Sequence, residues 1–594
     1  MNAKAAFQRF LLSRWLVPVA VLLPLLLQVQ GLWFGLAADD FLQHAKLVGG
    51  VGYAAQEQVL PDYFNGNPVF ELFEFFPRDP VHFDRMVDAG ILPWWAESGA
   101  SAAFFRPVSA VTHVFDTAVF GDAFWLHHLH SFVWAGLGIG LVSGLYRKVI
   151  PVPMVAAVAL LGFSLEEAHT MGTVWLANRN AWVALVFGVL AIRLHIAHQR
   201  HTTLWAAVAF GAALGAGEMG VCAGAYLVSW ELWKREGSVL SRMGRLLPYG
   251  VVFLLWCGAY IAGDFGVQGS GLYLDPLQSS EAFLQQLPGK LGVLIVGQAL
   301  QVPPEIWLAL PYSADVGFSL GAGLLLVVGG FLLWPWLRVD RSRLFWATGM
   351  FLCLIPVSGG FPMKRLLMFC GLGFFPLLAD FVGVLWREGS GQRPGLWRLS
   401  AARGLFFLHL VLGVVALPAD AYLSKRLFSA FEEGARSLPD DPALAEQNLI
   451  LMGSFDVANA FLPMIRSEFG LVSPRGQYLL GGLSGDMVVH RIASNVLEVE
   501  YPEGLLPGRI DWMSRGPWSE FVKGDSVSTA LFRATVLKDG GPTDPLRVRF
   551  EFDRNLEDPS LVWRAAEGRR LATFVPPTVG SHRVLSGRDL RDLF

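Results

Sequence analysis

Long apolar segments separated by short polar breaks dominate the first 420 residues of the chain. The first segment, Phe10–Ala38, is preceded or interrupted early by three basic residues, Lys4, Arg9 and Arg14. A helix of about 20 apolar residues crosses a hydrocarbon core of roughly 30 Å. The pattern therefore predicts a retained spanning helix, with its basic flank in the cytoplasm and the following residues on the outer side.

Ten further apolar runs bring the expected number of spans to about eleven. They are Phe124–Tyr146, Pro151–Ser164, Ala181–Ile196, Thr203–Ala216, Met219–Trp233, Leu247–Gly263, Gly317–Leu337, Leu344–Val357, Leu366–Trp386 and Ala402–Ala419. Basic loops follow the second, fourth, sixth, eighth and tenth spans, as cytoplasmic loops should. An odd number of spans places the carboxyl terminus on the outer side.

Two stretches outside these spans predict elements that lie in the membrane interface. The apolar run Leu291–Leu310 is broken by Pro303 and Pro304, and a crossing there would put the basic segment 338–343 outside, so we expect an interfacial or re-entrant element. The first outer loop, about Asp39–Ala123, carries aromatic clusters at 69–76 and 93–95. Amphipathic aromatic rings are favourable at the interface, which predicts interfacial helices in this loop.

Residues 421–594 change character. Two amphipathic helices are expected at about 422–437 and 442–468. Apolar and polar residues then alternate in runs at 487–501, 528–539, 546–553 and 561–568, separated by Gly and Pro turns. This alternation is typical of half-buried strands. The sequence thus predicts an all-α polytopic membrane domain at 1–420 and a small extracytoplasmic β-rich domain at 421–594.

Composition supports a membrane protein with many spans. Hydrophobic residues make up 53% of the chain and charged residues 16%, with a mean hydropathy of +0.45. All four cysteines lie in apolar runs without metal-ligand spacing, which predicts buried thiols and neither a disulfide framework nor a zinc site. We expect the plasma (inner) membrane as the location and no nucleic-acid partner.

Ionisable residues gather on the predicted outer face. Asp39 and Asp40 follow the first span directly. The others are Arg106, His127, His130, Glu166, His169, Arg179, Glu218, Asp315, Lys364 and Arg365. Each also has a plainer interpretation, since arginines snorkel to headgroups, histidines pack and acids cap helices. Ionisable groups at membrane depth are nevertheless costly, and a functional site is the default hypothesis for them.

These residues resemble motifs of the GT-C glycosyltransferases, most closely the tetratricopeptide-containing transmembrane O-mannosyltransferases and the related protein O-mannosyltransferases. In that group an acidic pair follows the first span, as Asp39–Asp40 does here. The other matching segments, in the same order, are Arg106–Pro107–Val108 with His127 and His130, His169–Arg179, Gly217–Glu218, Pro311–Val316 with Asp315, and Lys364–Phe374 with Arg365. The resemblance covers about residues 1–420.

The resemblance implies transfer of a sugar, a mannose-like hexose as first guess, from a polyprenyl-phosphate carrier to a hydroxyl, with inversion. It implies Asp39 as the base, supported by Asp40. We assign the donor phosphate to Arg106, Arg179, Arg365 and Lys364, because guanidinium and ammonium groups bind phosphate. The supporting polar residues are His127, His130, His169, Glu166, Glu218 and Asp315. No metal ligand is assigned, and a divalent metal is left open.

The chain also departs from the family pattern. Met171 replaces a Glu, Gly217 a Lys and Lys364 a Glu, and the β-rich domain stands where the tetratricopeptide tail would be. The acceptor is therefore left open between a protein and a glycan. Two alternatives remain: a flippase for lipid-linked sugars and a catalytically inactive glycolipid-binding relative. A flippase predicts inverted repeats with charges at mid-membrane, whereas the charges here lie on one face.

Overall fold

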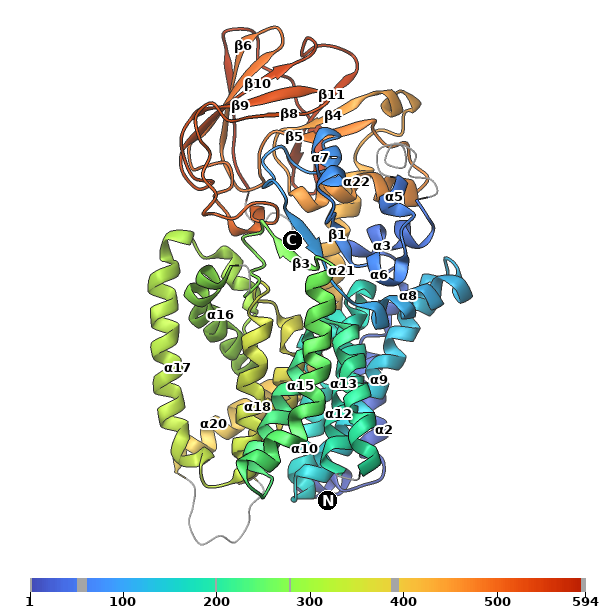
Figure 1. Ribbon diagram of the computed structural model, residues 1–594, viewed down its shortest axis with the longest axis vertical. Coiled ribbons are helices and arrows are strands. Elements are labelled where there is room, and N and C mark those ends of the chain that lie inside the picture. Colours follow the sequence, from blue (N-terminus) through green and yellow to red (C-terminus); the bar gives the residue numbers. More distant parts are fainter. Residues whose placement is uncertain (1–2, 51–60, 198–199, 277–278, 386–394, 589–594) are drawn as a thin grey trace.

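The computed structural model describes residues 3–50, 61–197, 200–276, 279–385 and 395–588. A bundle of long helices contains the amino terminus at one end, and a β-rich region covers the other end (Figure 1). The expected architecture, a helical membrane part followed by β-structure, is confirmed.

Every expected span coincides with helix. The helices are α2 (Leu16–Leu27), α9 (Phe124–Val149), α10 (Pro153–Ser164), α12 (Asn180–Ala197), α13 (Arg200–Ala216), α14 (Val221–Trp233), α15 (Val239–Ala262), α17 (Asp315–Leu337), α18 (Arg341–Val357), α19 (Met368–Val382) and the continuous pair α20 (Leu396–Phe406) and α21 (Gly413–Arg436). Among the described residues, six helical stretches are long and apolar enough to cross a membrane, and α2, α10 and α13 are shorter apolar helices. The protein is therefore an integral membrane protein, and the count of eleven spans stays a prediction. Parts of the expected basic loops, 198–199 and 386–394, lie outside the described residues.

Local chemistry explains where several helices begin. Asp340 accepts a hydrogen bond from the backbone N–H of Ser342 at 2.7 Å, an N-cap for α18. Pro153 occupies the first turn of α10, where its missing N–H costs nothing. Pro107 does the same for α8 (Pro107–Phe120), so that Arg106 stands at the cap position of that helix.

The element expected to be interfacial or re-entrant is α16 (Ser280–Leu300) followed by a short 3-10 turn, η5 (Pro304–Ala309). Proline explains the end of the helix, because Pro303 and Pro304 cannot donate the hydrogen bonds that would continue it. Arg509 of the β-rich region lies 4.1 Å above the ring of Trp307 in η5. The chain therefore returns to the β-rich end of the bundle before α17 begins.

The first loop forms short helices and one small sheet. The helices after the first span are α3 (Asp39–Leu47), α5 (Pro61–Phe64), α6 (Pro68–Glu71), α7 (Pro80–Asp88) and α8. The sheet has the order β1 (Glu74–Phe76), β2 (Ser101–Ala103) and β3 (Gly266–Gln268). The aromatic cluster at 69–76, expected to be helical, thus ends as a strand, because β2 supplies hydrogen-bond partners that the local pattern does not reveal.

The β-rich region contains two sheets. The larger is antiparallel with the order β13 (His582–Leu585), β6 (Met487–Ala493), β7 (Val496–Tyr501), β10 (Leu546–Phe552), β9 (Phe532–Lys538) and β8 (Ser526–Ser528). The smaller has the order β12 (Arg570–Thr573), β11 (Leu561–Glu567), β4 (Asn448–Leu451) and β5 (Gly476–Leu479). The predicted strand runs are therefore correct. The helix expected at 442–468 is wrong in its first half, where β4 pairs with β11 and β5, and α22 (Asp456–Glu468) is its second half.

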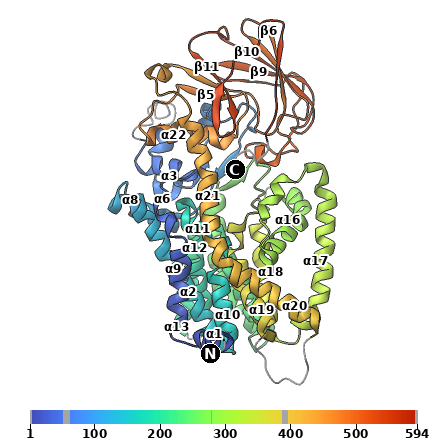
Figure 2. The same cartoon turned by 180° about the vertical axis from the view of Figure 1, so that it is seen from behind.

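The β-rich region is built onto the bundle. Helix α21 runs unbroken across the expected domain boundary at 420, and Figure 2 shows it rising from the bundle to the strands. Strands β4 and β5 are parallel, so they need a crossover, which α22 supplies. Trp94 of the first loop packs against Phe521 and Phe550, with ring centroids 6.1 and 5.6 Å apart. The first loop and the β-rich region therefore share one apolar core.

Candidate active site

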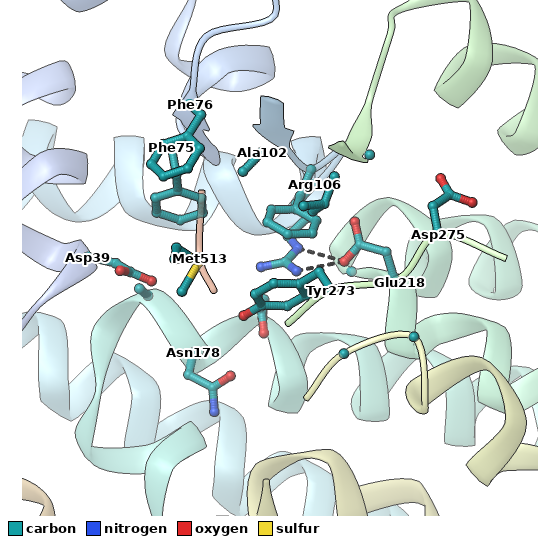
Figure 3. Close-up of a pocket in the computed structure, with 18 of the residues that line it drawn as sticks. Asp39, Phe75, Phe76, Ala102, Arg106, Asn178, Glu218, Tyr273, Asp275 and Met513 are labelled. Carbon is teal, nitrogen blue, oxygen red and sulfur yellow. Dashed lines mark hydrogen bonds and ion pairs between the residues drawn. The ribbon is translucent and has the colours of Figure 1, made fainter. Parts of the chain in front are cut away.

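A cavity of about 600 Å³ lies between the end of the helix bundle and the β-rich region. Charged side chains line its middle, and Figure 3 shows several of them around the open space. The charged lining residues are Asp39, Arg106, Glu218, Asp275 and Arg365. Four of the twelve residues predicted from the sequence, Asp39, Arg106, Glu218 and Arg365, thus share this cavity.

Asp39 is the first residue of α3 and faces the cavity (Figure 3). The residue before it, Ala38, has φ 47° and ψ −115°, a conformation that residues other than glycine rarely adopt. Such a strained backbone persists only where the surroundings hold it, and it is enriched at functional sites.

Asp40 holds this turn in place. Its carboxylate accepts hydrogen bonds from the backbone N–H of Ala37 at 3.0 Å and of Ala177 at 2.7 Å. The indole N–H of Trp175 donates to the carbonyl of Ala37 at 3.1 Å. Asp40 is only 2% exposed and is not among the cavity-lining residues. Asp40 therefore positions the turn that carries Asp39. This agrees with the prediction that Asp40 supports Asp39, and Asp40 does not reach the cavity as a second reacting carboxylate would.

Arg106 and Glu218 form an ion pair at the cavity wall. Two guanidinium nitrogens of Arg106, Nε and Nη2, approach Glu218 Oε2 at 2.8 and 2.7 Å. The guanidinium lies 4.4 Å from the ring centroid of Phe104. Glu218 Oε1 is buried and has no hydrogen-bond partner in the described part of the chain. Glu218 therefore orients Arg106 and leaves an oxygen free to accept from a ligand hydroxyl.

Arg365 lies on another side of the same cavity. One of its terminal nitrogens donates to the hydroxyl of Tyr273 at 3.2 Å, and its guanidinium lies 5.3 Å from the ring of Trp175. Its Nε–H is buried and makes no hydrogen bond to any described residue. An arginine with an unused donor suits an anionic ligand, because guanidinium binds phosphate through two parallel N–H donors.

The two arginines act on Asp39 through their charge. Burial raises the pKa of the Asp39 carboxyl to about 6, while Arg365 and, less strongly, Arg106 lower it. At neutral pH most Asp39 is therefore ionised yet poised to take a proton. A carboxylate with a pKa near the working pH is a suitable general base. The arrangement thus combines one base with two cations around a cavity of ligand size.

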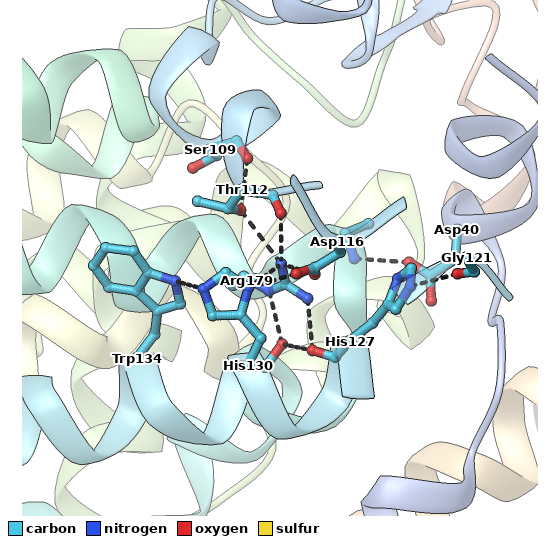
Figure 4. Close-up of polar contacts among 11 residues, drawn as sticks. Asp40, Ser109, Thr112, Asp116, Gly121, His127, His130, Trp134 and Arg179 are labelled. Carbon is cyan, nitrogen blue, oxygen red and sulfur yellow. Dashed lines mark hydrogen bonds and ion pairs between the residues drawn. The ribbon is translucent and has the colours of Figure 1, made fainter. Parts of the chain in front are cut away.

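Arg179, predicted to bind phosphate, lies away from the cavity in a buried network (Figure 4). Its guanidinium donates to Asp116 Oδ2 at 2.5 Å, to Ser131 Oγ at 2.8 Å and to the carbonyl of His127 at 2.7 Å. Both Arg179 and Asp116 have fully buried side chains. Because these partners occupy its donors, Arg179 joins α8, α9 and the start of α12 instead of facing a ligand.

The two predicted histidines of α9 belong to the same network. His130 Nδ1 is 2.6 Å from Asp116 Oδ1, and its Nε2 accepts from the indole N–H of Trp134 at 3.0 Å. His127 Nε2 is 2.9 Å from the carbonyl of Gly121. The two histidines share one face of α9, as predicted. Both make hydrogen bonds within the protein, which agrees with the plainer interpretation that they are packing residues.

The remaining predicted residues also lie outside the cavity lining. Lys364 forms an ion pair with Asp420 of α21, and Asp315 forms one with Arg509. Glu166 Oε2 lies 3.6 Å from His409 Nδ1, and His169 is buried against Phe163, with ring centroids 4.5 Å apart. Lys364 therefore does not face the cavity in which a donor phosphate would bind, because its ammonium group is paired with the Asp420 carboxylate.

Sequence reasoning missed several polar residues of the site. Tyr273, which supports Arg365, and Asp275 lie in the loop before α16, and Asn178 and Asn180 flank Arg179. The only local signal was their position in polar loops between predicted spans. Asp116, the partner of Arg179, lies within α8, and no local pattern marks it as a partner of Arg179. Across the described ranges, no group of three or more His, Cys, Asp or Glu side chains comes together to hold a metal ion.

Apolar side chains form the two ends of the cavity. The upper wall comes from the first loop and the β-rich region: Tyr63, Phe64, Met86, Ile91, Leu92, Val457, Ala460, Phe461, Met464 and Met513. The lower wall is one face of α15: Phe253, Trp256, Cys257, Tyr260 and Ile261. Its spacing of three and four residues is that of a helix face. Neighbouring apolar residues of α15, Leu254 and Leu255, are exposed.

Comparison with known proteins gives structural likeness only. The chain matches no family model and no curated protein. It is similar to the oligosaccharyltransferase of Archaeoglobus fulgidus in the apo form, at 10% identity and TM-score 0.41, over 79% of this chain and 65% of that one. A complex of AglB from the same organism with an inhibitory peptide and a dolichol-phosphate gives 12% identity and TM-score 0.38, over 78% and 65%. ArnT from Cupriavidus metallidurans bound to undecaprenyl phosphate gives 14% and 0.32, over 77% and 89%.

The chain thus spans less than two thirds of the length of the archaeal chains, 65%. The resemblance to the GT-C glycosyltransferases rests on the motifs of residues 1–420. Similarity at TM-scores of this size establishes neither function nor substrate.

Proposed function

We propose that this protein is a membrane glycosyltransferase that moves a sugar from a polyprenyl-phosphate donor to an acceptor hydroxyl. The observation that carries the proposal is the meeting of Asp39 with Arg106 and Arg365 in one cavity at the end of a membrane bundle. The sugar is a mannose-like hexose as first guess. The reaction takes place on the extracytoplasmic side of the plasma membrane, where the first span delivers Asp39.

Each group has one task in this reaction. Asp39 takes the proton of the acceptor hydroxyl as its oxygen attacks the anomeric carbon. The bond between that carbon and the phosphate oxygen breaks on the opposite face, which inverts the anomeric centre. Polyprenyl phosphate leaves with an additional negative charge, which Arg365 and Arg106 stabilise. Tyr273 and Glu218 hold these arginines in position through the contacts described above.

The apolar lower wall is suited to bind the polyprenyl chain of the donor. A polyprenyl chain is apolar and remains in the bilayer while its phosphate reaches the interface. The apolar face of α15 begins at the charged middle of the cavity and continues into a helix whose other apolar residues are exposed to lipid. The donor can therefore enter from the membrane with its phosphate towards the arginines.

The decisive experiment compares Asp39→Asn with the wild-type chain in nanodiscs supplied with radiolabelled polyprenyl-phosphate sugars. Asparagine preserves shape but cannot take the proton, so turnover should fall by about 10²- to 10⁴-fold with donor binding retained. Arg365→Ala should weaken donor binding as well, because it removes a phosphate contact.

Asp84→Asn is the matched control, since this carboxylate is exposed on α7 of the first loop and does not line the cavity. It should transfer sugar at the wild-type rate. Near-normal transfer by Asp39→Asn at normal abundance would falsify the catalytic assignment and favour the flippase or binding-only alternatives.

A further inference from the structure

The upper wall of the cavity offers almost no hydrogen-bonding groups. Five of its side chains, Met86, Ile91, Leu92, Phe461 and Met464, are each at most 7% exposed, and all are apolar. The wall's one hydroxyl, that of Tyr63, already donates within the first loop, with the carbonyls of Glu74 and Phe75 at 2.8 and 3.0 Å. Among the described lining residues, no side chain on this side offers a free hydrogen-bonding group to a sugar ring or a peptide backbone.

This composition discriminates between acceptor classes. A hydroxyl or amide moved from water against such a wall loses its hydrogen bonds at a cost of about 1–3 kcal/mol each. An apolar group gains about 25 cal/mol for each Å² it buries. A peptide or a free glycan is therefore disfavoured in the upper part of the cavity, and an alkyl or aryl group is favoured.

The donor lipid does not account for the upper wall. The lower wall belongs to α15, whose Leu254 and Leu255 are exposed, whereas the upper wall is made by α5, by α7 and the residues after it, by α22 and by Met513. These segments belong to the core that joins the first loop to the β-rich region. In the view of Figure 3, Met513 lies between Asp39 and Arg106, and all three line the same cavity.

Three methionines of this wall, Met86, Met464 and Met513, indicate the shape of the occupant. Methionine is unbranched and polarisable, and it adapts to irregular apolar partners. A wall that adapts in this way suits a flexible aliphatic chain better than a single rigid ring.

We propose that the upper wall binds the apolar body of the acceptor, so that the acceptor is an amphipathic hydroxyl compound, with its hydroxyl at Asp39 and its alkyl body against α22. The identification of the bound molecule as an acceptor rests on the proposed glycosyl transfer. The binding of an alkyl body to the upper wall is testable without any turnover.

The first experiment uses n-hexyl and methyl glucoside as acceptors, which differ only in the alkyl chain. With the full chain in nanodiscs, the hexyl compound should have a KM lower by about 10- to 100-fold, as expected for a few buried methylenes. Met464→Lys should raise the hexyl KM towards that of the methyl compound. Phe253→Ser, on the lower wall, should instead raise the KM for the polyprenyl donor. Equal KM values for the two glucosides, or better transfer to a serine peptide, would overturn the inference.

The second experiment photolabels the full-length Asp39→Asn protein with a hexyl glucoside that carries a diazirine. Label should appear on α22 or at Met513, and Met464→Lys should reduce it at least several-fold. Label confined to α15 would overturn the inference. Label on α22 together with no sugar transfer by the wild-type chain to any acceptor would refute the proposed function and leave the alkyl site standing.

Discussion

Three residues far apart in the sequence supply the base and the two cations of the proposed transfer. Asp39 follows the first span, Arg106 precedes α8 and Arg365 precedes α19, and each enters the cavity from a different element. Burial alone would disfavour the carboxylate of Asp39, and the two guanidinium groups oppose that effect. The same residues would therefore stabilise the leaving phosphate and tune the base.

The pH dependence of transfer follows from this balance. The pKa of Asp39 is raised to about 6, so kcat/KM should rise with pH below about 6 and level off above it. Arg365→Gln removes the stronger of the two opposing charges, so the inflection should move to higher pH. Arg106→Gln should move it less. Rates of label transfer between pH 4.5 and 8.5 measure both shifts, and an unmoved inflection in Arg365→Gln would contradict the assignment.

Asp116 should be a stability residue. Asp116→Asn leaves the fully buried guanidinium of Arg179 without its counter-charge, which typically costs about 3–5 kcal/mol. The thermal unfolding midpoint in detergent should fall accordingly. Asp84→Asn, an exposed change on α7, should leave the midpoint almost unchanged. If Asp116→Asn kept the wild-type midpoint and lost donor binding instead, Arg179 would act on the substrate as its motif suggests.

At the scale of elements, α22 links the β-rich region to the cavity. It is the crossover between β4 and β5, and its Val457, Phe461 and Met464 line the upper wall. Its first residue, Asp456, accepts a hydrogen bond from Ser514 Oγ at 3.1 Å, next to Met513. Two segments of the upper wall are thus joined through one buried carboxylate.

Ionisation of this carboxylate should loosen the wall. Burial, with a further contribution from Asp511, raises the pKa of Asp456 to about 7, and burial raises that of Asp511 to about 6. Unfolded Asp ionises near 3.8, so the unfolded chain releases these protons first and stability should fall as pH rises from about 4 to about 7. Asp456→Asn should flatten that decline in the unfolding midpoint, and the exposed Asp88→Asn should not. An equal decline in Asp456→Asn would refute the role of this carboxylate.

At the scale of the whole molecule, the β-rich region completes the cavity. Trp94 packs into it from the first loop, and Met513 and α22 return from it to the site. The alternating strand pattern predicts a separate domain at 421–594. The shared core joins the strands to the first loop and to Trp175 at the end of the bundle, while the interior of the bundle forms a separate apolar core.

The topology prediction can be tested on the intact chain. The amino terminus and the β-rich region lie at opposite ends of the molecule (Figure 1), as eleven spans require. In a Cys257→Ser background, cysteine at the exposed positions Glu503 and Val339 should react with an impermeant maleimide from the outer and the cytoplasmic side, respectively. Labelling of position 503 from the cytoplasmic side would show that the orientation is the reverse of the one predicted.

The sequence by itself determined the elements. Spans and strands are local patterns, continuous apolarity or alternation, so each expected span and each predicted strand run found its counterpart near the expected residues. The position of Asp39 at the end of the first span was equally local. Where pairing was non-local the sequence was insufficient: β1 and β4 were read as helix, because their partner strands lie far along the chain.

Only the tertiary structure decided which charges meet. Arg179 and Arg365 each stand just before a predicted span and Arg106 lies in the first outer loop, and nothing in the local sequence separates their roles. Arg179 is neutralised by Asp116, which projects from a different helix, while Arg365 keeps a donor without a partner among the described residues. Local hydrophobicity fixes the depth of a side chain in the membrane, but the rotation and packing of the helices fix its partners, and it is the partners that separate a structural arginine from one that can bind a phosphate.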